Sequence, residues 1–233
     1  MCIRDSRIGL DSRHRGFSNT TRVPILPDEN EISAYRRLAA FVGIDASNSS
    51  SVFSPTPEDT SVACRLDEEF RPVESDRHIL IAPGGGMNPG AVDLTKRWPA
   101  ERYAALGDHL ASEFGGHISL IGTASDANSI GAVKRAMTCP VTDLTGRTSF
   151  GQLGALMSQS QLVIGNDSAA THLSISVGTP TVTIFTSTEP WIYGSDEPHA
   201  ASVSTGSPEE GLRDIPTVEM VLAAARQLLR GAN

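Results

Sequence analysis

The sequence predicts an α/β fold, with helices covering both faces of a parallel β-sheet. From residue 77 onward, short apolar segments of strand length alternate with segments of helical periodicity. Glycine, proline or polar turn residues separate these segments. The chain has 233 residues with 39% hydrophobic content, which is enough for the core of one large domain or two small ones.

The region before residue 77 predicts one helix and a linker. Apolar residues of helical spacing are Ile32, Tyr35, Leu38, Ala39 and Val42. They predict a helix over Glu29–Val42. Residues 46–76 are rich in serine, proline and acidic residues, with almost no apolar periodicity, which is typical of a linker. Because one helix with one apolar face is no domain, we expect residues 1–45 to be the remnant of a truncated domain, followed by a linker over 46–76 and an α/β domain over 77–233.

The first strand of the α/β domain is predicted over His78–Ala82, and a glycine-rich loop follows it. A helix is expected to start at Pro99, because proline suits the first helical turn. Its apolar stripe consists of Tyr103, Leu106, Leu110 and Phe114. Gly115 and Gly116 then end this helix, and His117–Ile121 form the second predicted strand.

The middle of the domain continues the alternation with a helix over Ala127–Met137 and a short strand over Val141–Leu144. Ser149 and Gln152 have the spacing of a capping box, which predicts a helix over Phe150–Met157. A strand over Gln161–Gly165 follows.

The last part of the domain contains the clearest βαβ unit. After the strand that ends at Gly165, a short helix is expected to run through Val177 and to end at Gly178. A strand over Thr181–Phe185 follows. The final helix is predicted from Pro216 to Gly231, with one apolar face.

Charge and composition limit the partners. The formal net charge of −8 argues against a broad nucleic-acid-binding surface, so an anionic ligand would be bound locally. The apolar runs are too short to cross a bilayer and no apolar signal segment opens the chain, so we expect a cytoplasmic protein. Cys2, Cys64 and Cys139 are odd in number and widely spaced. They predict neither a disulfide framework nor a zinc site, and no metal or cofactor is expected.

A glycine-rich loop and a basic segment are the first candidate binding elements. Gly84, Gly85 and Gly86 follow the first strand and would let the backbone approach a ligand closely. Their spacing matches no standard phosphate-binding motif, and a surface turn is the alternative. Lys96, Arg97 and Trp98 stand just before a helix start, where cations oppose the helix dipole. An anionic ligand would explain them, and an exposed basic pair beside a packed Trp98 is the alternative.

A second candidate loop follows the strand that ends at Gly165. Asn166, Asp167 and Ser168 precede a helix, and the backbone N–H groups of Ser168 and Ala169 could hold a phosphate. Asp167 or neighbouring hydroxyls could hold sugar hydroxyls. Simple capping of the helix is the alternative reading. His172 lies one turn into this helix, and a structural histidine is its alternative.

Two further loops are expected beside the ligand. Gly122 and Thr123 follow the second strand, and Thr145 and Gly146 follow the third. In open α/β sheets, ligands bind beyond the carboxyl ends of the strands, so these loops belong to the same edge as the others. For the loop with Gly146, a simple helix entry is the alternative.

Taken together, these segments resemble the C-terminal domain of glycosyltransferase family 9, the heptosyltransferases of lipopolysaccharide core assembly. The resemblance covers His78 to about Pro190. The motifs that carry it, in family order, are Asn88-Pro89-Gly90, Lys96-Arg97-Trp98-Pro99, Asp143-Leu144-Thr145-Gly146 with Thr148 and Ser149, and Asn166-Asp167-Ser168 followed by His172 and Leu173. The chain departs from the family pattern at Ala169, Ala170 and Thr186.

The resemblance implies the C-terminal half of a GT-B type glycosyltransferase, in which two Rossmann-like domains face each other and the C-terminal domain binds the donor. It implies transfer of a sugar, with heptose from ADP-heptose as the expected donor group, to a lipopolysaccharide core or similar lipid-linked acceptor. Lys96 and Asp167 would be the catalytic residues of this half. The general base would lie in the missing N-terminal domain, so this fragment is expected to be inactive alone.

The same resemblance implies a location at the inner face of the inner membrane, with a peripheral membrane contact. A second function stays open at this point: a non-catalytic nucleotide-sugar-binding or interaction module that keeps the donor site without the chemistry.

Overall fold

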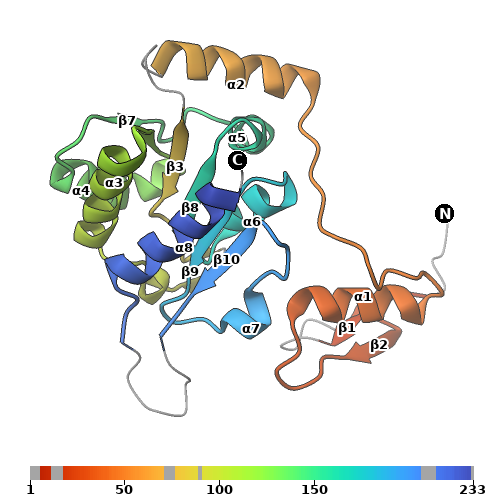
Figure 1. Cartoon of the computed structure of the whole chain (residues 1–233). Helices are drawn as coiled ribbons and strands as arrows, with labels where there is room; N and C mark the ends of the chain where they lie inside the picture. The colour runs from red at the N-terminus through yellow and green to blue at the C-terminus, as the bar shows by residue number, and fades with distance from the viewer. Residues whose placement is uncertain (1–5, 12–17, 71–76, 89–90, 206–213, 232–233) are drawn as a thin grey trace. The chain divides into compact units, whose positions relative to one another are not determined.

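The computed structural model describes residues 6–11, 18–70, 77–88, 91–205 and 214–231 (Figure 1). The chain forms two compact units. Unit 1 comprises Met1–Ser50 and Trp191–Gly194, and unit 2 comprises Ser51–Pro190 and Ser195–Asn233. Among the described residues, no helix combines the length and apolar character that a membrane-spanning segment needs.

Unit 1 consists of a parallel strand pair, a helix and a short outlying segment. Strands β1 (Ile8–Asp11) and β2 (Thr21–Pro24) pair in parallel, and helix α1 (Glu31–Phe41) follows. The helix that the sequence predicts here is confirmed, with slightly tighter bounds. Asn30 caps it, because its side chain accepts hydrogen bonds from the first backbone N–H groups of the helix. The Asn30 amide also donates to the carbonyls of Trp191 and Gly194 in the short helical turn α7 (Pro190–Tyr193) and just after it.

Unit 2 contains a six-stranded sheet in which all neighbouring strands are parallel. Its strands are β3 (His78–Ala82), β6 (His117–Leu120), β7 (Val141–Asp143), β8 (Leu162–Asn166), β9 (Thr181–Ile184) and β10 (Ala200–Val203). Their spatial order is β10-β9-β8-β3-β6-β7. The chain starts at the centre with β3, moves outward over β6 and β7, returns to β8 beside β3, and moves outward on the other side. This is the strand order of a doubly wound Rossmann-like sheet, and its switch point lies between β3 and β8.

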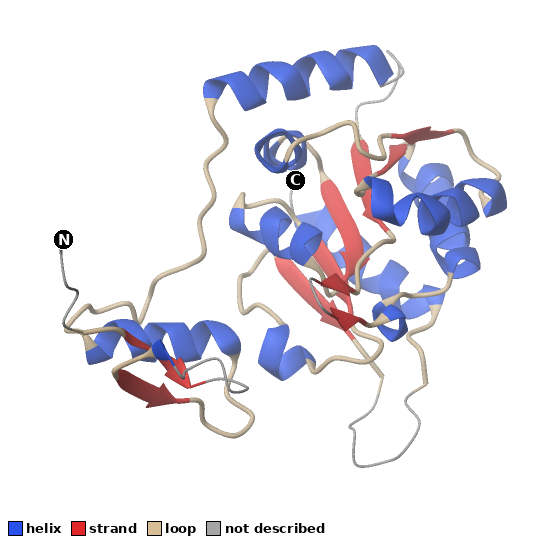
Figure 2. Cartoon of the chain, turned by 180° about the vertical axis from the view of Figure 1, so that it is seen from behind, coloured by secondary structure: helices blue, strands red, loops and turns tan. Residues whose placement is uncertain are grey.

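Helices cover both faces of this sheet, as Figure 2 shows from behind. On one face, Ile79 and Ile81 of β3 belong to a core built with α3 (Ala100–Phe114), α4 (Ala127–Ala136) and α8 (Val218–Gly231). On the other, Leu80 and Ala82 pack with α2 (Pro57–Phe70), α5 (Phe150–Ser158) and α6 (Ala169–Ser176). Alternate residues of a central strand therefore meet opposite helical layers, which explains why β3 is buried throughout. The predicted fold class is confirmed.

The predicted linker is the part of the fold where the structure differs most from the sequence prediction. Within residues 46–76, α2 forms 14 residues of helix. Its partly or fully buried positions are Asp59, Val62, Ala63, Leu66, Asp67 and Phe70. They have helical spacing, but two of them are acidic, so the apolar stripe is too sparse to stand out from the sequence. Asp67 is buried because its carboxylate pairs with Nδ1 of His78 at 2.9 Å.

Short elements join the larger ones near the carboxyl edge of the sheet. Strands β4 (Met87–Asn88) and β5 (Ala91–Val92) pair antiparallel, and the 3₁₀ turns are η2 (Leu94–Lys96) and η3 (Ala124–Asp126). Pro89 and Gly90, which belong to one of the family-like motifs, lie outside the described residues. The helix predicted from Pro99 is confirmed as α3, and it ends at Gly115 in the left-handed conformation with φ 64°.

Candidate functional site

The candidate site lies at the switch point, where the loops after β3 and β8 meet. A Cβ atom added at Gly85 would lie 3.1 Å from Cβ of Ser168, so the two loops are in close contact. Because adjacent strands at a switch point send their connections to opposite sides, this edge offers a crevice between the loops where ligands bind in such sheets.

The glycine-rich loop is held in a fixed conformation rather than being a free surface turn. Gly85 and Gly86 have φ values of 115° and 74°, which side-chain-bearing residues rarely adopt. A Cβ at Gly86 would overlap the carbonyl oxygen of Asp93, and a Cβ at Gly84 would overlap the Asp126 carboxyl group. Glycine is therefore required at each of the three positions, for conformation or for space.

Asn166 connects this loop to the end of β8. Its side chain is fully buried. The amide Oδ1 accepts hydrogen bonds from Trp98 N–H and from the Tyr103 hydroxyl, both at 2.9 Å. The amide Nδ2 donates to the carbonyls of Pro83 and Gly84 at 3.0 and 2.8 Å. The sequence predicts a donor contact here. In the structure, all four hydrogen-bonding positions of the side-chain amide are filled by the protein itself.

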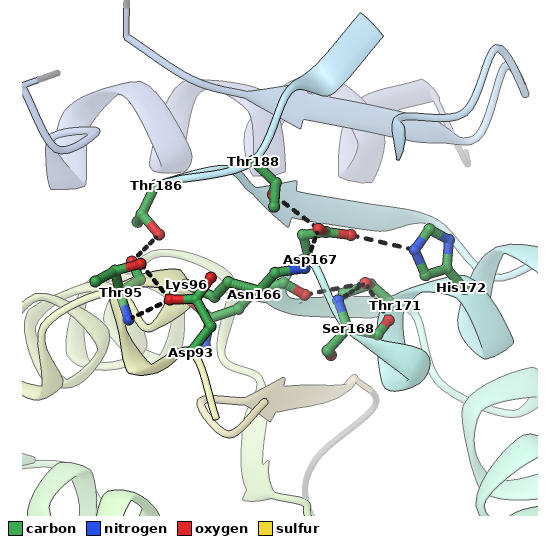
Figure 3. Close-up of polar contacts among 10 residues, drawn as sticks. All are labelled: Asp93, Thr95, Lys96, Asn166, Asp167, Ser168, Thr171, His172, Thr186 and Thr188. Atoms are coloured by element: carbon green, nitrogen blue, oxygen red, sulfur yellow. Dashed lines mark hydrogen bonds and ion pairs between the residues drawn. The ribbon is translucent and has the colours of Figure 1, made fainter. Parts of the chain in front are cut away.

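Lys96 and Asp167 form the charged centre of the site (Figure 3). The Lys96 ammonium lies 2.9 Å from Oδ2 of Asp167, and their side chains are 20% and 5% exposed. Lys96 ends η2, whereas Asp167 directly follows β8, so the pair joins the two sides of the switch point. The structure thus brings together the two residues that the sequence marks as catalytic.

Asp167 is held ionised by its neighbours. Burial raises the pKa of Asp167, but hydrogen bonds from three side chains and the charge of Lys96 outweigh burial and lower the pKa from 3.8 to about 2. These side chains are Lys96, Thr188, whose hydroxyl donates to Oδ2 at 2.7 Å, and His172, whose Nε2 lies 3.2 Å from Oδ1. The His172 side chain is about half exposed.

A further contact joins the loop after β9 to η2. The Thr186 hydroxyl donates to the carbonyl of Thr95 at 2.6 Å, as Figure 3 shows. Thr95 in turn is held by Asp93, whose carboxylate accepts from the Thr95 backbone at 3.1 Å. Thr186, one of the three positions at which the chain departs from the family pattern, therefore holds the segment that carries Lys96.

Arg97 and Trp98, which the sequence predicts to bind the donor, have protein partners in the structure. Arg97 donates through Nε to the Gly85 carbonyl at 2.9 Å and through Nη1 to Ser129 at 2.6 Å, and its Nη2 lies 3.4 Å from Asp126. Trp98 is only 2% exposed and belongs to the core between sheet and helices. Its indole N–H donates to the carbonyl of Pro216 at 2.7 Å. The basic segment therefore brings the Lys96 ammonium to Asp167, whereas Arg97 holds the backbone of the glycine loop.

The start of α6 supplies backbone N–H groups beside Asp167. Ser168 is the N-cap residue and Ala169 is the first residue of the helix. The first N–H groups of a helix have no partner within it and favour anions. Ala169 is exposed. The Thr171 hydroxyl holds the turn: it lies 3.0 Å from the carbonyl oxygens of both Asn166 and Ser168, and it accepts a hydrogen bond from the Ser168 N–H at 3.4 Å.

The loops after β6 and β7 border the glycine loop. The Gly146 N–H donates to the Gly122 carbonyl at 2.8 Å, which joins these two loops. The Thr123 hydroxyl donates to Oδ2 of Asp126 at 2.7 Å. Thr145 bonds instead to its neighbour Asp143. Gly122 and Thr123 therefore lie one loop beyond the glycine loop at the carboxyl edge of the sheet, and Thr145 and Gly146 lie two loops beyond it.

Asp126 and Thr188 are site residues that the sequence reasoning missed. Oδ1 of Asp126 accepts from Gly85 N–H at 3.2 Å, so this buried carboxylate holds the glycine loop from the side opposite Asn166. The Thr123-x-x-Asp126 capping spacing is a signal that could have identified it. No local pattern marks Thr188. Among the described residues, no group of three His, Cys, Asp or Glu side chains is placed to hold a metal ion.

Comparison with known proteins gives consistent matches. The family profile "Glycosyltransferase family 9 (heptosyltransferase)" matches residues 1–212. Two proteins described as lipopolysaccharide heptosyltransferase 3, from Escherichia coli and its strain K12, are 32% and 31% identical over about half of this chain. These alignments cover 37% and 34% of the two relatives, so the matched part is about a third of their length.

Solved structures agree with this result. A glycosyl transferase family 9 protein from Veillonella parvula aligns with a TM-score of 0.79 and 26% identity, over 93% of this chain and 64% of that one. The ADP-heptose LPS heptosyltransferase II of E. coli aligns with a TM-score of 0.75 and 22% identity, over 98% of this chain and 71% of that one. The α/β fold of this chain therefore matches a GT-B heptosyltransferase structure over part of that structure's length. The chain belongs to glycosyltransferase family 9, the heptosyltransferase family.

Proposed function

We propose that this chain supplies the donor-binding half of a heptosyltransferase, which transfers heptose from ADP-heptose to a lipopolysaccharide core or similar lipid-linked acceptor. The observation that carries the proposal is the placement of Lys96. Its ammonium is held at the switch point, between a glycine loop and the start of α6. A cation, the N–H group of Ala169 at the start of α6 and close backbone approach are together suited to a diphosphate.

The relatives support the choice of donor. The curated relatives are described as lipopolysaccharide heptosyltransferases, and a solved structure of the E. coli heptosyltransferase WaaC contains ADP-2-deoxy-2-fluoro heptose. That structure aligns with a TM-score of 0.58 and 14% identity, over 92% of this chain and 60% of that one, so it supports the fold and not the individual contacts. A lipid-linked acceptor would place the reaction at the cytoplasmic face of the inner membrane, with a peripheral contact.

The proposed chemistry uses charge at the leaving group. When the bond between the sugar and the diphosphate breaks, negative charge increases on the departing ADP. Lys96 would neutralise this charge, and the N–H group of Ala169, next to the Ser168 N-cap, would add to the effect. Asp167 is ionised at neutral pH, with a pKa of about 2. It would hold Lys96 in place and accept hydrogen bonds from sugar hydroxyls, with His172 beside it.

The proposed reaction also needs an acceptor site, and this chain covers only part of its relatives. This chain spans 64% of the Veillonella protein, and its alignments cover about a third of the curated relatives. We propose that the acceptor site and the general base belong to the part of these relatives that the chain does not cover. The 233-residue chain is then expected to bind donor without transferring sugar.

The test is calorimetric titration of the chain with ADP-heptose and with ADP, without added divalent metal. The sequence contains two lysines, Lys96 and Lys134, which gives a matched pair of variants. Lys96→Ala is expected to weaken binding by about 1.5–3 kcal/mol, the range for a hydrogen bond to a charged group. Lys134→Ala, on the exposed side of α4, should bind like the unaltered chain. No binding by the folded, unaltered chain, or equal loss in both variants, would contradict the proposal.

A further inference from the structure

We propose that Asn166 is a positioning residue, which fixes the glycine loop and Lys96 relative to Asp167 and does not itself contact the donor. The inference deepens the proposed function. Its consequence for donor binding rests on that function, whereas its consequence for Lys96 does not.

The orientation of the Asn166 amide is determined by its partners. Trp98 N–H can only donate, so the amide atom that it meets must be the oxygen. The carbonyls of Pro83 and Gly84 can only accept, so the amide atom between them must be the nitrogen. Tyr103 completes the set. Burial raises the pKa of its hydroxyl well above 10, so the group keeps its proton and donates it to Oδ1.

These contacts join the three parts of the site through one rigid group. Nδ2 holds the glycine loop by two successive carbonyls, and Oδ1 holds the backbone of Trp98, two residues beyond Lys96. Asn166 directly precedes Asp167, which binds the Lys96 ammonium. Because a planar amide has fixed donor and acceptor ends, the side chain sets the distance between the two loops that face each other across the switch point.

Replacing the amide by a carboxylate reverses only half of these contacts. In Asn166→Asp, the oxygen facing Trp98 N–H and Tyr103 is kept, while the atom between the two carbonyls changes from donor to acceptor. The buried, ionised carboxylate then repels the carbonyls of Pro83 and Gly84. Burial and these carbonyls raise the pKa of the introduced group, whereas the hydrogen bonds from Trp98 and Tyr103 lower it. Its protonated form can donate one hydrogen bond again. The defect should therefore be reversible by acid.

The test measures the acylation of Lys96 relative to Lys134 by peptide mass spectrometry, at a temperature where circular dichroism shows the protein folded. Lys134 serves as the control for reagent and pH within each molecule. In the unaltered chain we expect Lys96 to react more slowly than Lys134. Asn166→Asp should raise the Lys96/Lys134 ratio about tenfold at pH 8.5, the effect of losing one hydrogen bond to a charged group. The ratio should return toward its original value by pH 6.

Two control variants separate positioning from general loss of structure. Tyr103→Phe removes one of the contacts to Oδ1 without touching the glycine loop, and it should change the ratio less than about threefold. Asn166→Ser removes the donors to the carbonyls without introducing charge, so it should raise the ratio at all pH values. If Asn166→Asp does not fold, Asn166→Ser takes its place as the test of positioning. An unchanged ratio in a folded Asn166 variant, or an increase in Asn166→Asp that acid does not reverse, would overturn the proposal.

Donor binding is measured on the same variants. If the unaltered chain binds ADP-heptose, Asn166→Asp should weaken binding about tenfold or more at pH 8.5, with recovery on acidification. If the unaltered chain does not bind, the proposed function fails, while the labelling ratio still decides whether Asn166 positions Lys96.

Discussion

Asp167 shows how neighbours can outweigh burial at a single residue. Its side chain is 5% exposed, a location that disfavours charge, yet its pKa is lowered to about 2. The carboxylate accepts hydrogen bonds on both oxygens, and one of its partners is a cation. An isolated buried charge of this kind would be strongly destabilising, so the ion pair is best regarded as a unit whose halves depend on each other.

The pKa of Asp167 gives a prediction for stability against pH. Because the pKa is lower in the folded state than in the unfolded state, its contribution is complete above about pH 4 and is lost as pH falls from about 4 to about 2. Asp167→Asn should cost about 2 kcal/mol at pH 7, and the difference from the unaltered chain should shrink as pH falls through this window. This difference in free energy of unfolding is measured by urea unfolding of unit 2, followed by Trp98 fluorescence in a Trp191→Phe background.

The comparison variant is Glu113→Gln, which removes an exposed carboxylate paired with Arg226. Exposed pairs contribute little to stability, so its effect should be smaller at every pH. If Asp167→Asn kept its full cost at pH 2, the carboxylate would not be the source of the stability.

At the scale of elements, the glycine loop and the end of α3 offer a matched pair of glycines. Gly86 and Gly115 both have positive φ, but only Gly86 faces backbone, since nothing lies within 4 Å of a Cβ at Gly115. Gly115→Ala should cost about 1–2 kcal/mol, the strain of the left-handed conformation alone. Gly86→Ala should cost more, because the loop must shift, and it should also weaken ADP binding. Thermal unfolding measures the stability of both variants, and calorimetry measures their ADP binding. Equal loss of stability and equal ADP binding in the two variants would contradict a fixed conformation of the glycine loop.

Helix α2 gives a second prediction at this scale. Ala63 is fully buried against the sheet and packs with the core around Leu80, whereas Glu68 on the same helix is exposed. Ala63→Leu should destabilise unit 2 by about 1–3 kcal/mol through overpacking. Glu68→Leu, the control, should have an effect within about 0.5 kcal/mol. Chemical denaturation measures both effects. If residues 57–70 were an unpacked linker, both substitutions would leave the free energy of unfolding unchanged.

The elements also show what the sequence can and cannot predict. Strands such as β3 and β8 are continuous apolar runs bounded by turn residues, so their positions were predicted to within about a residue or two. Strand β10 (Ala200–Val203) was missed because its short AASV segment consists of small residues apart from Val203, its one buried residue. Helix α2 was missed because acidic residues interrupt its inner face. In these cases, tertiary packing rather than local pattern determines the structure.

The site was predicted in location but only partly in detail. Strand order brings Lys96 and Asp167 to one edge, and that edge follows from the βαβ pattern. The direction of each side chain does not follow from it. Arg97, Trp98 and Asn166 stand in the predicted loops, yet all three turn into the protein and hold those loops in place. Asp126 reaches the glycine loop from a different strand connection, a contact that only the folded sheet creates.

At the scale of the whole molecule, the charged centre and the loops that hold it belong to unit 2. Unit 1 has a small core, in which Val23 and Ala34 are the buried apolar residues among those described. A unit with so little buried apolar surface gains little stability from its own interior. Ligand binding at the switch point should therefore stabilise unit 2 without a matching effect on unit 1.

The two tryptophans of the chain make this testable, because each unit holds one: Trp98 lies in unit 2 and Trp191 in unit 1. Trp191→Phe leaves a fluorescence probe of unit 2, and Trp98→Phe leaves a probe of unit 1. At a donor concentration about 100 times the Kd, unit 2 should gain about 2.7 kcal/mol in free energy of unfolding. The Trp191 transition should not move.

Lys96→Ala in the Trp191→Phe background is the control for ligand specificity. It weakens donor binding, so the same donor concentration should stabilise unit 2 less, whereas Lys134→Ala should keep the full effect. A shift of the Trp191 transition as large as that of Trp98 would mean that the units unfold together. In that case the donor would stabilise the whole chain, and the separation into two independently stabilised units would be wrong.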